Sequence, residues 1–199
     1  MKQEEKSRKS REHILSFAFA EFAEHGYSEA SINSICSAGK ISKGLLYHYY
    51  ADKNALYLAC VEKCFRELTA YLSSHLDAAG VTPDQYFNVR LAYFIANPLH
   101  QKLFCDTVVN PPQHLRSELS SCRSEFDRLN ETMLTAILEK ETLAEGVSIQ
   151  NAIYQLQIFE DFVSTRLKNA GPEAKQAEAH SQLCRQSFYT MLYGLIARK

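Results

Sequence analysis

Hydrogen-bond donors are concentrated between residues 41 and 53, in the stretch ISKGLLYHYYADK. Lys43 has a long cationic side chain, and Tyr47 and His48 follow it one helical turn later. Such groups pair with guanine acceptors and with phosphate oxygens, and Lys53 adds a second cation at the end of the stretch. These residue types in this order therefore favour nucleic-acid binding over catalysis.

The elements that must position these donors are two short helices joined by a tight turn. Ser31 and Ser42 are typical helix caps, and Asp52 is placed to cap a third, longer helix. Gly39-Lys40 lies between the two short helices and supplies the turn. This is the helix-turn-helix plan, in which the second helix enters the major groove of DNA.

The same stretch resembles the tetracycline-repressor (TetR) family of bacterial regulators. The resemblance covers about residues 9–69 and rests on the first amphipathic helix, the motif ISKGLLYHY and the start of the next helix. It implies operator binding through Ser31 and Asn33 on phosphate and sometimes a base, Lys43, Gly44 and Leu45 on bases, and Tyr47, His48 and Lys53 on phosphate. It also implies a small core of Ile35, Ile41, Leu46 and Tyr50.

Three residues depart from the family pattern. Lys40 stands in the turn where the family usually has glycine, and a left-handed lysine costs roughly 1 kcal/mol more than glycine. Lys40 also offers a further phosphate contact. Tyr50 replaces the usual Phe, so its hydroxyl needs a partner or water, and Cys36 replaces a typical Ala. None of these changes removes the donors on which DNA binding depends.

Helical periodicity extends over almost the whole chain, and no alternating strand pattern interrupts it. We expect an all-α protein with a three-helix helix-turn-helix domain at 9–69 and a helical effector-binding and dimerisation domain at 70–199. The longer helices are predicted at 8–25, 53–79, 83–97, 99–109, 113–140 and 149–169, followed by one last helix.

The two C-terminal helices have more apolar surface than one neighbour covers. The 149–169 helix has two apolar faces, and the last helix is apolar over most of its circumference, with Leu183, Cys184, Phe188, Met191, Leu192, Leu195 and Ile196. Such a helix must be covered on most sides, which favours a partner subunit over a central core position. The family resemblance implies a homodimer through these two helices.

The resemblance also implies an inducer pocket among the central helices. Ligand binding there would shift the 53–79 helix and move the two recognition helices apart. The candidate ligand contacts are Phe65, Tyr86, Tyr93, Phe94, His100, Phe104 and Phe126. Each taken alone is better explained as core packing, but together they favour an apolar or aromatic inducer.

Two of the six cysteines, Cys60 and Cys64, share one helix face. Such a pair can bind a soft metal or respond to oxidants, but small apolar packing is the favoured interpretation. No second CxxC or CxH pair supports a zinc site. We therefore expect neither a metal nor a cofactor.

Composition limits the alternatives. The chain has 199 residues and a net charge of −1, so any DNA site must be a local patch, and the N-terminal cluster Lys2, Lys6, Arg8, Lys9 and Arg11 supplies one. No apolar run of membrane-spanning length or signal core is present, so we expect a cytoplasmic protein with reduced thiols. No phosphate-binding glycine loop, HExxH motif or nucleophile elbow indicates an enzyme.

Two other functions fit the same helices. One is a helical ligand-binding or scaffolding protein that no longer binds DNA, and the other is a repressor that senses thiols or metal. The basic N-terminus, Lys43 and Lys53 favour a repressor released by a small molecule.

Overall fold

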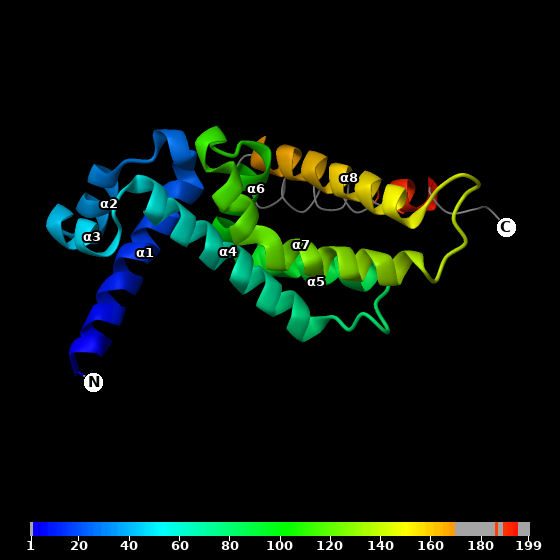
Figure 1. The fold of residues 1–199 in the computed structure, drawn as a ribbon, viewed down its shortest axis with the longest axis horizontal. Coiled ribbons are helices and arrows are strands. Elements are labelled where there is room, and N and C mark those ends of the chain that lie inside the picture. Colours follow the sequence, from blue (N-terminus) through cyan, green and yellow to red (C-terminus); the bar gives the residue numbers. More distant parts are fainter. Residues whose placement is uncertain (1, 170–185, 187–188, 195–199) are drawn as a thin grey trace. The chain divides into compact units, whose positions relative to one another are not determined.

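The computed structural model describes residues 2–169, 186 and 189–194. In chain order the helices are α1 (Lys2–Glu29), α2 (Ile32–Gly39), α3 (Lys43–Tyr49), α4 (Lys53–His75), α5 (Pro83–Ala96), α6 (Pro98–Val109), the 3-10 turn η1 (Gln113–Leu115), α7 (Arg116–Leu138) and α8 (Ile149–Asn169) (Figure 1). The all-α prediction is confirmed. The predicted last helix lies mostly outside the described residues, although 186 and 189–194 are helical.

The chain divides into two compact units. The first contains Met1–Arg66 and Pro98–Arg123, and the second contains Glu67–Asn97 and Ser124–Lys199. The unit boundaries therefore fall inside α4 and α7. The domain boundary expected after residue 69 stays a prediction, and the units differ from it in placing α6 with the N-terminal helices.

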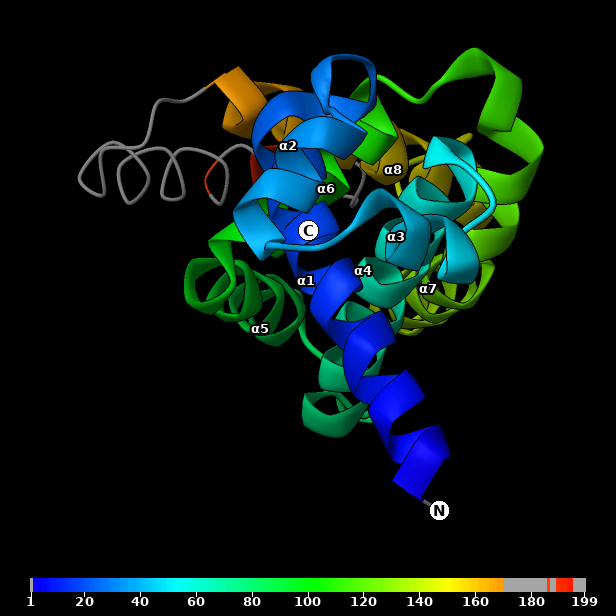
Figure 2. The same ribbon diagram turned by 90° about the vertical axis from the view of Figure 1, so that its left-hand side faces the viewer.

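The first unit is built around the apolar stripe of α1. Ile14, Ala18 and Phe22 recur at intervals of four and are fully buried, as the periodicity predicts. Helix α1 packs against α2 and α6. Lys102 on α6 donates to the Glu24 carboxylate on α1 at 2.6 Å at the surface of this contact. Figure 2 shows α2, α3 and the N-terminal half of α1 on the side facing the viewer.

The predicted bounds of two helices, α1 and α4, are wrong. Helix α1 begins at Lys2 and not near residue 8, and it continues past a kink at Gly26 (φ 68°) to Glu29. Its first turns are rich in Glu, Gln and Lys, which favour helix without an apolar face. Helix α4 ends at His75 and not near residue 79. There the Ser74 hydroxyl donates to the Tyr71 carbonyl at 2.8 Å, which satisfies a carbonyl of the last turn.

In the second unit, the helix start predicted at Thr82-Pro83 is present in the structure. Thr82 and Gln85 form a reciprocal capping box at the start of α5, with Pro83 at the first helical position. The buried Tyr86 hydroxyl on α5 donates to the side-chain carbonyl of Asn130 on α7. Figure 1 draws α5 alongside the C-terminal part of α7, in agreement with this bond.

Candidate nucleic-acid interface

Side-chain caps define the two short helices, as predicted. The Ser31 hydroxyl oxygen accepts from the Asn33 backbone N–H at 3.1 Å, and the Ser42 hydroxyl oxygen accepts from the Leu45 N–H at 3.2 Å. Asp52 accepts from the Ala55 N–H at 2.8 Å and caps α4. Each hydroxyl that accepts in this way keeps its own proton, which remains available to a phosphate oxygen.

The turn between α2 and α3 contains the residue that departs from the family pattern. Lys40 is left-handed, with φ 51° and ψ 41°, and its exposed side chain has no internal partner among the described contacts. The next residue, Ile41, donates its N–H to the Cys36 carbonyl at 2.8 Å and closes the end of α2. Lysine therefore adopts the conformation for which the family uses glycine and leaves a cation in the turn.

Helix α3 has one buried side and one exposed side. Leu46 is fully buried, and the three other predicted core residues Ile35, Ile41 and Tyr50 are buried with it. On the opposite side Leu45 is 39% and Tyr47 is 49% exposed. Lys43 and His48 are exposed as well, and so is Asn33 on α2. An added side-chain carbon at Gly44 meets nothing within 4 Å, so another molecule can approach its backbone closely.

Lys53 is a predicted DNA contact whose charged group already has internal partners. Its ammonium donates to the Ser28 carbonyl at 3.3 Å and lies 4.7 Å from the centre of the Tyr27 ring. Partial burial lowers the pKa of Lys53, while the Glu21 carboxylate acts in the opposite direction. The ammonium is therefore held at the junction of α1 and α4, where it presents its charge with little side-chain freedom.

A polar cluster that sequence reasoning missed supports the aromatic ring beneath Lys53. The Tyr27 hydroxyl donates to the Asn54 side-chain carbonyl, and His114 Nε2 lies 3.2 Å from the same hydroxyl. Tyr27 and His114 are 87 residues apart, so no local pattern could have indicated the contact. This cluster joins the end of α1, the start of α4 and the turn η1 within the first unit.

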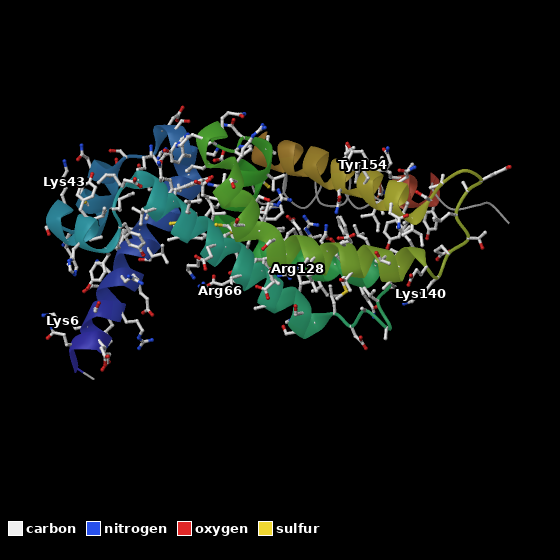
Figure 3. The ribbon with its side chains drawn as sticks, in the orientation of Figure 1. Lys6, Lys43, Arg66, Arg128, Lys140 and Tyr154 are labelled. Atoms are coloured by element: carbon white, nitrogen blue, oxygen red, sulfur yellow. The ribbon has the colours of Figure 1, made fainter. Side chains whose placement is uncertain are left out.

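The N-terminal turns of α1 are fixed against the C-terminal end of α3, which was also missed. The Tyr49 hydroxyl donates to the Ser7 hydroxyl at 3.1 Å, and the Arg11 guanidinium lies 5.7 Å from the centre of the Tyr49 ring. His13 Nε2 lies 2.9 Å from the Gly39 carbonyl in the turn. Figure 3 labels Lys6 on α1 and Lys43 on α3, both at the left of that view.

The candidate ligand contacts fall into both units. In the first, Phe65 and Phe104 are buried with ring centroids 5.2 Å apart, and the half-buried His100 packs on Phe19 at 4.6 Å. In the second, the aromatic candidates Tyr86, Tyr93, Phe94 and Phe126 are all buried. The contacts within each unit are those of a packed core, and the ligand role of these residues stays a prediction.

A polar group lies within the aromatic set of the second unit. Arg90 Nη1 donates to the Tyr86 hydroxyl at 3.0 Å, and its guanidinium lies 5.6 Å from the centre of the Phe126 ring. Asn130 is buried and accepts from Tyr86. Arg90 and Asn130 were not among the predicted contacts, because the sequence of a helix does not indicate which residues an arginine or asparagine side chain contacts.

The two cysteines of α4 are buried. Burial raises the pKa of the Cys60 thiol, and the neighbouring Cys64 adds to the effect. A thiol that stays protonated is a poor nucleophile and a poor metal ligand. Among the described residues, no group of three or more His, Cys, Asp or Glu side chains is placed to hold a metal ion. In the same part of the chain, no helix is long and apolar enough to cross a membrane.

The fold and the capped pair of short helices define a helix-turn-helix protein. The sequence profile described as "Bacterial regulatory proteins, tetR family" matches residues 14–60. The repressor DhaR of Mycobacterium sp. strain GP1 is 30% identical over 73 residues, which are 37% of each chain. The regulator BetI of Yersinia pestis is 34% identical over 71 residues, which are 36% of each chain. The chain thus spans less than half the length of these relatives.

Solved structures extend the likeness of fold to most of the chain. A tetR-family regulator from Chloroflexus aurantiacus superposes with a TM-score of 0.68 at 19% identity, covering 96% of this chain and 95% of that one. The fatty acid degradation regulator FadR from Bacillus halodurans gives a TM-score of 0.69 at 16% identity, over 89% of this chain and 96% of that one. Residues 14–60 thus match the tetR family of bacterial regulatory proteins, and the fold of most of the chain is similar to that of solved tetR-family structures.

Proposed function

We propose that the protein is a sequence-specific DNA-binding transcriptional regulator, a dimeric repressor that a small-molecule inducer releases from operator DNA. One observation carries the proposal above all others. Helix α3 is capped at its start and anchored by the buried Leu46, while Lys43, Gly44, Leu45 and Tyr47 lie on its exposed side. An exposed helix face with a cation, an open glycine and an apolar contact suits the edges of bases in a major groove.

The remaining predicted contacts support phosphate binding around that face. The Ser31 hydroxyl, the Asn33 amide and the His48 ring frame the two helices, and Lys53 presents a fixed cation at the start of α4. Phosphate contacts of this kind set the orientation of the protein on DNA. The base-facing residues of α3 then supply the sequence preference.

The unequal burial of apolar side chains on α8 supports the proposed dimer. Ala152, Ile153 and Leu156 are buried, whereas Tyr154 is 61% and Ile158 is 44% exposed. A second copy of the chain that covers Tyr154 and Ile158 removes this apolar surface from water. Two recognition helices in one dimer then read half-sites separated by about 34–36 Å.

The inducer is proposed to bind aromatic side chains. The candidates are Phe65, His100 and Phe104 in the first unit and Tyr86, Tyr93, Phe94 and Phe126 in the second, each unit being considered by itself. Arg90, beside Tyr86 and Phe126, adds a polar group that suits one end of a mainly aromatic ligand. To switch between bound and released states, the inducer must favour the released state by a few kcal/mol.

A mobility-shift assay with DNA from directly upstream of the protein's own gene tests the proposal. We expect binding that prefers this DNA over a scrambled duplex and that weakens steeply with salt. Lys53→Ala should weaken binding to both duplexes and reduce the salt slope by about 2, because each dimer loses two phosphate contacts. Binding that lacks sequence preference, or lacks salt dependence, would support a helical scaffolding protein instead.

A further inference from the structure

An open depression of about 550 Å³ lies beside the recognition helix. Five residues of α1 line it (Glu5, Lys6, Lys9, Ser10 and His13), and Leu45 of α3 completes it. Leu45 is one of the exposed residues on the face proposed to meet bases. The depression therefore continues the proposed DNA surface from α3 onto α1.

The α1 side of this depression carries cations that the fold leaves available. Lys6 is exposed and forms no ion pair or hydrogen bond within the part of the chain that the structure describes. Lys9 pairs with Glu5 at 2.8 Å, but the two side chains are 68% and 56% exposed. An exposed ion pair of this kind contributes little and exchanges readily for another anion. Both lysines are thus available to an anionic partner.

The position of this basic segment relative to α3 is fixed. The bond between Tyr49 and Ser7 and the contact of Arg11 with the Tyr49 ring hold the first turns of α1 against the end of α3. The bond between His13 and Gly39 holds the next turn against the helix-turn-helix turn. A cation on these turns therefore keeps its place beside α3.

We propose that Lys6 and Lys9 bind the sugar-phosphate backbone of the DNA strand that borders the major groove occupied by α3. This extends the DNA interface beyond the helix-turn-helix, and it rests on the proposed function. Charge selects the occupant, because Lys6 and Lys9 line an open depression and the duplex next to α3 carries a continuous line of phosphates. The contact adds affinity without sequence information.

The double variant Lys6→Ala/Lys9→Ala tests the inference on the full-length protein and the upstream DNA. Because a dimer loses four lysines, the slope of log affinity against log salt should fall by about 3–4, with the preference over scrambled DNA unchanged. Hydroxyl-radical footprinting should show lost protection of sugars flanking each half-site. Arg66→Ala is the matched control and should leave the salt slope unchanged, because Arg66 forms an exposed ion pair with Glu62 on α4 and does not line the depression.

A second pair of variants should raise DNA affinity instead of lowering it. Glu5→Gln frees Lys9 and removes a negative charge from the depression, so DNA affinity should rise severalfold. Glu12→Gln makes the same charge change in the Arg8–Glu12 ion pair of α1. Its effect on DNA affinity should be smaller, because Glu12 does not line the depression. Equal effects of Glu5→Gln and Glu12→Gln would overturn this inference, and so would an unchanged salt slope in the double lysine variant. Neither result would contradict the proposal that the protein is a repressor. Absence of DNA binding by the unaltered protein would overturn both.

Discussion

His13 on α1 and Gly39 at the end of α2 are joined by a hydrogen bond of 2.9 Å from the imidazole Nε2 to the carbonyl oxygen. The backbone at Gly39 is tightly enclosed, since an added side-chain carbon would lie 2.4 Å from Ile41 Cδ1 and 2.9 Å from Phe17 Cδ2. The turn that sets the angle between α2 and α3 is thus held on one side by a polar contact and on the other by close packing.

Gly39→Ala should destabilise the protein by about 1–3 kcal/mol, because the methyl group has no room and its neighbours must shift. Urea unfolding measures this free energy. Gly44→Ala is the control, because a methyl group there meets nothing within 4 Å and alanine favours helix, so stability should hold or rise. If α3 approaches DNA as proposed, Gly44→Ala should still lose operator affinity. Equal stabilities of the two variants would contradict the packing argument.

Lys40→Gly should stabilise the protein by a few tenths to about 1 kcal/mol, because Lys40 is left-handed and glycine adopts that conformation without a side-chain clash. Lys40→Ala keeps the clash and should unfold close to the unaltered protein. Both variants remove the same charge, so any loss of DNA affinity should be shared. A gain in stability common to both would point to charge repulsion and not to backbone conformation.

The sequence predicted those features that arise between near neighbours. Ser31, Ser42 and Asp52 bond to backbone groups two or three residues away, so residue type alone located the start of three helices. The spacing of Ile14, Ala18 and Phe22 likewise identified the buried face of α1. Such contacts depend on local geometry, which the order of residues determines directly.

Contacts between distant segments could not be predicted in this way. Tyr27, Asn54 and His114 meet beneath Lys53, although up to 87 residues separate them. The contact of Arg90 with Tyr86 could not be predicted either. Helical spacing indicates which face of a helix a side chain lies on, but not which residue it contacts. The early start of α1 was missed for another reason, because its first turns are polar and show no apolar period.

Stability should decline in alkaline solution because of the first unit's buried core. Burial raises the pKa of the Cys60 thiol above its usual 9.0 and that of the Tyr57 hydroxyl above its usual 10.0. Both groups ionise more easily in the unfolded chain, so their contribution is complete below about pH 9 and is lost as the pH rises further. Urea unfolding from about pH 7 to about pH 10 should show this decline.

Cys60→Ala should flatten that pH dependence, whatever it does to stability at neutral pH, because it removes a buried titrating group. Cys122→Ala is the matched control. Burial and the Glu62 carboxylate also raise the pKa of Cys122, but this thiol is only half-buried and its removal should change the profile less. A Cys60→Ala profile as steep as that of the unaltered protein would show that other groups control the alkaline transition.

Tyr154→Glu/Ile158→Glu should prevent dimer formation, because the two exposed apolar side chains of α8 would become charges that a second copy must bury. Sedimentation velocity should show a monomer at concentrations where the unaltered protein is a dimer. Operator affinity should fall because one chain reaches only one half-site. Gln155→Glu adds a charge at an exposed polar position of the same helix and should leave the dimer intact. A dimer that survives the double substitution would place the subunit interface elsewhere on the chain.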